Sequence, residues 1–146
     1  MRIFKGPESG DESNRSSDDA ETLDLFITVA LPQTLMLQYP MQSDHTLVIT
    51  TTDNEKEAEF LARSLLEARL AACVQIVPVR SLYRWEGRIE EAAEWRLEIK
   101  TRADLYPRIE ALLKAQHSYD TPEILRIPVA GGSAEYRAWI DASTGE

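Results

Sequence analysis

The stretch of residues 69–87, RLAACVQIVPVRSLYRWEG, constrains the fold of this chain more than any other segment. It begins as the end of a helical pattern and continues with period two, which is the rhythm of a β-strand. Pro78 interrupts that alternation, and a proline cannot donate to a strand ladder, so it indicates a bulge or an edge strand. Gly87 permits a tight turn. The stretch therefore predicts a long, bent strand that carries Tyr83 and Trp85 toward its far end and turns into a second strand.

The second strand of this hairpin is predicted over residues 88–101. Its clearest part alternates, with Trp95, Leu97 and Ile99 on the face that we expect to point inward. The middle of the strand is acidic, which is typical of a solvated face, and attraction of cations is the alternative. The acidic residues are Glu90, Glu91 and Glu94.

Periodic patterns on either side of the hairpin predict the remaining elements. They are a strand over residues 45–52, a helix after a capping box that begins at Thr52, a helix over residues 103–116, a strand over residues 124–129 and a short last helix capped by Ser133. Pro107 is tolerated only in a first turn, so the second helix should start near Asp104. This order is the α+β, ferredoxin-like split βαβ pattern, βαββαβ, with an added C-terminal helix.

A sheet of this kind carries its helices on one face and leaves the other face bare. Several large aromatic residues lie in the predicted strands, namely Tyr83, Trp85 and Trp95. A bare apolar face has to be covered. We therefore expect a homo-oligomer in which the long hairpin reaches across to a neighbouring subunit.

Composition bounds the class of protein. The chain has 146 residues, of which 43% are hydrophobic and 28% charged, as in an ordinary globular protein with a core. Its net charge of −9 disfavours nucleic acid and anionic membrane surfaces as main partners. No apolar run approaches the roughly 18–20 residues that span a bilayer. The single cysteine, Cys73, excludes an intramolecular disulfide and fits a reducing compartment, so we expect a cytoplasmic protein.

Residues 1–44 differ from the rest of the chain. Residues 6–21 are rich in Gly, Ser, Asp and Glu, so they cannot offset the entropy lost on ordering. We predict a disordered extension before a domain over residues 45–146. Residues 25–37 are more apolar, and the alternative is a strand or short helix that docks on the domain or on a neighbouring subunit. The acidic lead-in argues against a targeting peptide. Met41 is an alternative start of the protein.

Five short motifs follow one another within residues 45–142. They are RLAAC at 69–73, SLYRWEG at 81–87, IKT at 99–101, HxYxxPE at 117–123 and YxxWI at 136–140. In this order and spacing they resemble the CutA family of divalent-cation-tolerance proteins. The resemblance implies a ferredoxin-like protomer assembled as a homotrimer through strand pairing between subunits. It also implies association with copper or other divalent ions, and no enzymatic reaction.

The resemblance also suggests metal ligands, namely His117 and Glu123. The position near Thr50, where a bacterial relative has a cysteine ligand, holds no cysteine here. A copper site at this position would therefore lack its soft thiolate ligand. Cys73 is the third candidate ligand, although a cysteine within a strand usually packs as a small hydrophobe. The alternative is that neither residue is a metal ligand: His117 would cap the preceding helix and Glu123 would pair with an arginine. We therefore expect weak binding at most.

Three other functions compete with metal tolerance. A trimeric small-molecule sensor like the PII signalling proteins would bind a ligand in clefts between subunits, lined here by aromatic rings, Arg84, Lys100 and Glu123. The chain has no glycine-rich phosphate cradle to support that alternative. An acylphosphatase-like enzyme would need an arginine after the first strand, where residues 51–55 are acidic, so we expect no enzyme. A purely structural trimer is the remaining alternative.

Overall fold

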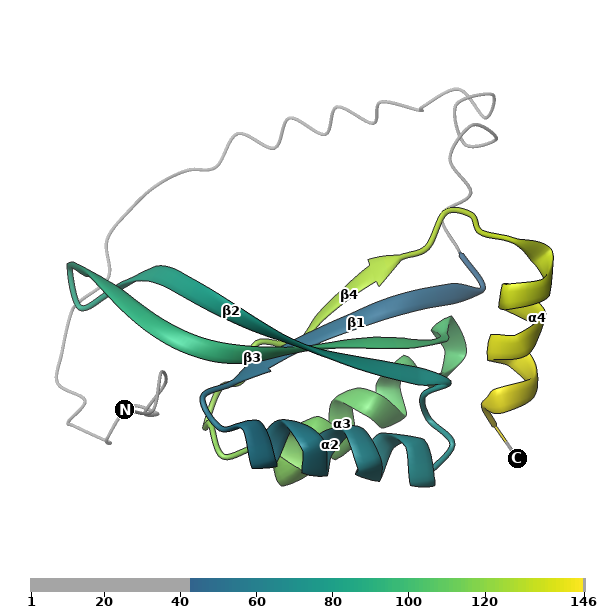
Figure 1. The fold of residues 1–146 in the computed structure, drawn as a ribbon, viewed down its shortest axis with the longest axis horizontal. Helices are drawn as coiled ribbons and strands as arrows, with labels where there is room; N and C mark the ends of the chain where they lie inside the picture. Colours follow the sequence, from purple (N-terminus) through teal and green to yellow (C-terminus); the bar gives the residue numbers. More distant parts are fainter. Residues whose placement is uncertain (1–42, 146) are drawn as a thin grey trace, which may run out of the picture. The chain divides into compact units, whose positions relative to one another are not determined.

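The computed structural model describes residues 43–145 (Figure 1). The predictions for residues 1–42, including the disordered extension, the docking of residues 25–37 and the start at Met41, lie outside the described residues. The elements are β1 (His45–Thr52), α2 (Glu55–Glu67), β2 (Cys73–Trp85), β3 (Arg88–Arg102), a 3-10 turn η1 (Ala103–Leu105), α3 (Tyr106–Gln116), β4 (Leu125–Pro128) and α4 (Ala134–Ser143).

The four strands form one antiparallel sheet in the order β2-β3-β1-β4. Helices α2 and α3 lie side by side on one face of it, and α4 stands apart at the end where β1 begins (Figure 1). The predicted α+β, βαββαβ arrangement with a C-terminal helix is therefore confirmed. No helix in residues 43–145 combines the length and the apolar character needed to cross a membrane.

The β2–β3 hairpin is the longest feature of the sheet. Its register runs without a break from Cys73 opposite Lys100 to Trp85 opposite Arg88, so Pro78 lies on an edge strand and not in a bulge. The turn consists of Glu86 and Gly87, with φ of 46° and 78°, as a two-residue type I′ turn requires. A connection this short does not supply the long loop that a PII-like sensor would use.

The start of α2 differs from the prediction. The N-cap is Asn54, whose side chain accepts the backbone N–H groups of Lys56 at 2.9 Å and Glu57 at 3.2 Å. Thr52 is still part of β1, and its hydroxyl donates to the Glu57 carboxylate. The predicted capping box at Thr52 is wrong because α2 begins at Glu55, two residues later than a box with Thr52 as its N-cap requires.

The core lies between the sheet and the two helices. Its fully buried large side chains come from both helices and from the two central strands. They are Leu61, Leu65, Ile109, Leu113, Val48, Leu97 and Ile99. Pro107 is in the first turn of α3, as predicted. Buried threonines extend this face of β1, and the hydroxyl of Thr46 donates to the Ile127 carbonyl at 2.9 Å.

The opposite side of the sheet, termed the open face, carries neither α2 nor α3 (Figure 1). Its apolar part is formed by Leu47 and Ile49 of β1 and by Ile127 and Leu125, their partners on β4. Leu125 is 54% exposed and Ile127 43% exposed. The prediction of an apolar sheet face without covering helices is therefore confirmed for residues 43–145.

Candidate functional site

The loop that joins α3 to β4 is held against the end of β1 by His117. The side chain of His117 is fully buried. Its Nε2 lies 2.9 Å from the carbonyl oxygen of Thr51, and its Nδ1 accepts the backbone N–H of Tyr119 at 3.0 Å. Because a carbonyl only accepts, these two contacts assign the proton of the neutral ring to Nε2. Both ring nitrogens are therefore engaged by the main chain.

Glu57 of α2 holds the same loop from the other side. Its carboxylate accepts the backbone N–H of Ser118 at 2.6 Å and the Ser118 hydroxyl at 2.9 Å, and lies 4.0 Å from the His117 ring. Partial burial acts to raise the pKa of Glu57, but hydrogen bonds from Thr52 and Ser118 outweigh it and lower that pKa below its ordinary value. Glu57 is therefore held as a carboxylate.

Tyr119 belongs to the same loop and contacts both His117 and Glu94. Its ring centroid is 4.8 Å from that of His117, and its hydroxyl donates to Glu94 at 3.2 Å. Burial, with the nearby carboxylates of Asp53 and Glu94, raises the pKa of Tyr119. Glu94 is only 5% exposed, so the expectation of a solvated acidic strand is wrong for this residue. Glu91, in contrast, is exposed and pairs with Arg80 at 3.3 Å.

Glu123 approaches β1 at the same residue as His117. Its side chain is exposed and accepts a hydrogen bond from the Thr51 hydroxyl at 3.3 Å. The two predicted ligands thus contact the carbonyl and the hydroxyl of a single residue. The structure therefore brings His117 and Glu123 to one neighbourhood, the end of β1.

Cys73 lies elsewhere. It is a half-buried free thiol at the start of β2, paired across the ladder with Lys100. The position of β2 that is level with Thr51 is Val77, so Cys73 lies roughly 13 Å farther along the strand. Cys73 is therefore not part of the neighbourhood of His117 and Glu123.

The fit of these residues to a metal ion can be judged from their contacts. Within residues 43–145, no three or more His, Cys, Asp and Glu side chains are grouped so that they could hold a metal ion. A closed structural site needs about four ligands, and His117 has no free ring nitrogen to offer. Residues 43–145 of a single chain therefore hold no preformed, tight metal site.

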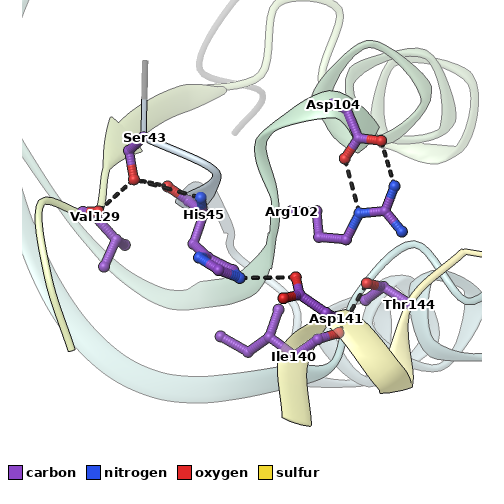
Figure 2. A network of polar contacts seen from close by, with 8 residues as sticks. All are labelled: Ser43, His45, Arg102, Asp104, Val129, Ile140, Asp141 and Thr144. Atoms are coloured by element: carbon purple, nitrogen blue, oxygen red, sulfur yellow. Dashed lines mark hydrogen bonds and ion pairs between the residues drawn. The ribbon is translucent and has the colours of Figure 1, made fainter. Parts of the chain in front are cut away.

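A second polar network lies at the opposite end of β1 (Figure 2). Nε2 of His45 is 2.8 Å from a carboxylate oxygen of Asp141 in α4. The Ser43 hydroxyl donates to the carbonyl of His45 at 2.8 Å and also contacts the Val129 carbonyl. The hydrogen bond of Arg102 to Asp104 raises the pKa of Arg102 against burial, and the charge of Asp141 adds to that effect.

Several of these residues escaped the sequence analysis. His45 was expected only to begin a strand, and nothing local links it to Asp141, which lies 96 residues later. No role was assigned to Glu57 from the sequence. One signal could have revealed it: Asn54 is a better N-cap than a strand threonine, and that shift turns Glu57 toward the loop after α3.

Comparisons with known proteins find sequence relatives over this domain. A model of the family described as CutA1 divalent ion tolerance protein matches residues 46–143. The chain is 45% identical over 101 residues to the divalent-cation tolerance protein CutA of Pectobacterium atrosepticum, covering 68% of this chain and 92% of the relative. It is 43% identical over 97 residues to the protein of that name from Archaeoglobus fulgidus, covering 66% and 95%.

Solved structures agree with this result. The structure described as the periplasmic divalent cation tolerance protein CutA from Archaeoglobus fulgidus matches with a TM-score of 0.66 at 42% identity, covering 68% of this chain and 97% of that chain. CutA1 from Oryza sativa matches with a TM-score of 0.68 at 40% identity, covering 71% and 96%. The similarity extends over the described domain in both sequence and fold.

Proposed function

Because this chain belongs to the CutA1 divalent ion tolerance protein family, we propose that it contributes to tolerance of divalent cations as a homotrimer that binds copper or other divalent ions weakly. The observation that carries the proposal is the match over nearly the full length of relatives named divalent-cation tolerance proteins. This family is not a family of enzymes, as the sequence analysis expected.

The uncovered open face supports self-association. Leu125 and Ile127 are exposed on the open face. Leu82 and Ile89, near the tip of the hairpin, are also exposed, and their strand register places them on the opposite, helix-bearing side of the sheet. Exposed apolar side chains of this kind are typical of a protein interface. A second copy of the chain is the occupant that we propose, because the hairpin extends beyond the helices and presents its own apolar side chains (Figure 1).

Two different edge strands support a closed ring. Among the described residues, the sheet ends in β2 on one side and β4 on the other, and an edge strand can offer main-chain N–H and C=O groups to a further strand. Because the two edges differ, β2 of one copy can pair with β4 of the next copy. Head-to-tail contacts of this kind close into a ring when the rotation allows it, and a trimer is a small closed ring.

The contacts of His117 and Glu123 explain why metal binding should be weak. An ion that coordinates Nδ1 of His117 has to displace the Tyr119 N–H, and an ion on Nε2 has to displace the proton shared with Thr51. The carboxylate of Glu123 is exposed and gives up only one bond, from the Thr51 hydroxyl. Glu123 is therefore the candidate ligand that is most accessible, and Cys73 would bind an ion separately.

Titration calorimetry with Cu(II) and Zn(II) tests this assignment. We expect weak binding by the wild type and at least a severalfold weaker affinity for Glu123→Gln and for His117→Ala. Asp120→Asn is the matched control, since Asp120 is an exposed carboxylate in the same loop. Isotherms of His117→Ala identical to wild type would remove His117 from the site, and Cys73→Ser tests the separate thiol in the same way.

We propose that the protein is cytoplasmic, on the basis of its single, free cysteine. The names of relatives include a periplasmic and a chloroplastic protein, so the family is not confined to one compartment. Fractionation of the native cells, followed by detection of this chain, tests the proposal. Recovery with periplasmic or organellar markers would contradict it.

A further inference from the structure

The C-terminal helix α4 buries very little apolar surface. All side chains from Ala134 to Trp139 are exposed, and Ile140 is the buried residue of the helix. Tyr136 and Trp139 stack on each other at 5.3 Å and stay 44% exposed. Apolar packing within the chain is therefore a small part of what holds α4 in place.

Polar contacts are concentrated in the C-terminal half of the helix instead. Asp141 receives the contact from His45 at 2.8 Å, and His45 is itself buried at the start of β1 (Figure 2). Arg102 is the cross-strand partner of His45, and its guanidinium is held in place by Asp104. Asp141 therefore contacts His45 directly, and its charge also acts on Arg102.

Arg69 forms the second anchor. Its Nε donates to the Gly145 carbonyl at 2.6 Å, its guanidinium also reaches the Ala142 carbonyl at 3.3 Å, and its own carbonyl accepts the Gly145 N–H at 3.0 Å. The bond to Ala142 satisfies a carbonyl of the last helical turn, which has no partner inside the helix, and the two bonds to Gly145 fix the residue that follows the cap. Arg69 adopts φ of 54°, a left-handed conformation that is unfavourable for arginine.

Gly145 completes this arrangement. Its φ is +83°, and a Cβ at this position would lie 2.9 Å from Nη1 of Arg102. The atom that a Cβ would meet is the flexible end of Arg102, so it is the left-handed φ of Gly145 that favours glycine at this position. At the other end, α4 contacts the open face through Tyr136, whose ring centroid lies 5.9 Å from the ammonium of Lys100.

We propose that α4 is a latch, closed over the end of the open face by the polar anchors at His45 and Arg69, which opens as a unit when either anchor is lost. Opening uncovers Lys100 and frees the Tyr136–Trp139 pair, while the sheet and the helices α2 and α3 stay folded. The proposal follows from the position of the anchors: they hold one half of the helix, and the other half is exposed.

Hydrogen exchange of the full chain, measured by mass spectrometry, tests the latch through two variants. Asp141→Ala removes the contact with His45 but places a better helix former in α4, so helix propensity alone predicts slower exchange. Arg69→Gly removes the guanidinium but relieves the left-handed strain, so backbone preference alone predicts a more stable turn. In both variants the effect of the latch has the opposite sign to the local effect.

We expect the amides of α4 to exchange about tenfold faster in each variant, since each loses a hydrogen bond to a charged group. The amides of β1 should exchange as in wild type. Glu135→Gln is the control, because it removes a carboxylate from the same helix without touching either anchor. Exchange in α4 that is unchanged, slower, or no faster than in Glu135→Gln would overturn the proposal.

Light scattering on the same samples records the oligomeric state. A wild-type monomer would remove the homotrimer and leave the test of the latch intact. Equal acceleration of β1 and α4 in Asp141→Ala would show global unfolding, and this result would also overturn the latch.

Discussion

At the scale of single residues, His117 and Glu57 show how one loop is held by two neighbours of different kinds. Within residues 43–145, the buried imidazole hydrogen-bonds to main-chain groups, and the carboxylate accepts three hydrogen bonds from Thr52 and Ser118. The resemblance to a metal-tolerance family pointed to His117 as a ligand. In the folded chain, the hydrogen bonds of His117 to Thr51 and Tyr119 hold the loop after α3. A metal ion that bound His117 would have to displace one of them.

A prediction at this scale concerns Glu57→Gln. We expect a loss of about 1–3 kcal/mol in the free energy of unfolding at pH 7, because a hydrogen-bonded carboxylate is replaced. The pKa of Glu57 is lowered from 4.5, so its contribution is present above that value and is lost as pH falls through the lower pKa of the folded state.

Urea unfolding at pH 7 and at about pH 3 measures this effect, and the difference between the variant and wild type should shrink in acid. Glu59→Gln is the control, since Glu59 is exposed on the same helix. Equal losses in the two variants at pH 7 would contradict the role assigned to Glu57.

At the scale of elements, the β2–β3 hairpin depends on its two-residue turn. Both turn residues have positive φ, and glycine adopts this conformation at no steric cost whereas an L side chain does not. Around Gly87 there is open space: among the described residues, no atom beyond its chain neighbours lies within 4 Å of the point where a Cβ would stand. The glycine is therefore needed for its backbone conformation and not for packing.

We accordingly expect Gly87→Ala to lower the free energy of unfolding by about 1 kcal/mol. Gly131→Ala is the matched control, since Gly131 also has open space among the described residues but no positive φ. This control should be neutral or stabilising by up to about 1 kcal/mol, because alanine restricts the unfolded chain. Thermal unfolding compares the two variants, and a Gly131→Ala variant as unstable as Gly87→Ala would refute the argument.

At the scale of the whole molecule, the open face exposes apolar side chains in the single chain. Leu125 and Ile127 of β4 are exposed on this face, and among the described residues the sheet ends in the edge strands β2 and β4. The central part of the same sheet is packed on its other face by α2 and α3. Assembly with further copies would give the open face the cover that the helices give the opposite one.

Substitution of β4 tests this at the same scale. Leu125→Glu should reduce the mass found by light scattering from that of a trimer to that of a monomer, because a charge buried in an interface without a partner costs several kcal/mol. Phe60→Glu is the matched control: Phe60 is 53% exposed and Leu125 54%, but Phe60 lies on α2 and not on the open face. A trimer that survives Leu125→Glu but not Phe60→Glu would place the interface on the helices.

The order of elements, the hairpin, the edge position of Pro78 and the first turn at Pro107 were all open to prediction from sequence. Each depends on local chemistry: a period of two or 3.6, a proline that lacks an N–H, or a glycine that accepts positive φ. The cap at Asn54 was missed because neighbouring residues offer several N-cap candidates and only the length of β1 decides among them.

What the sequence by itself determined is therefore the chain of helices and strands, the long hairpin and the membership of a family. Tertiary structure alone decided which polar groups meet, because His117 finds Thr51 across 66 residues, Glu123 finds Thr51 across 72, and His45 finds Asp141 across 96. Such contacts depend on strand register and on how the helices dock, and neither is encoded in local periodicity. For the same reason, burial of both nitrogens of His117 and the polar anchoring of α4 became visible only in the folded chain.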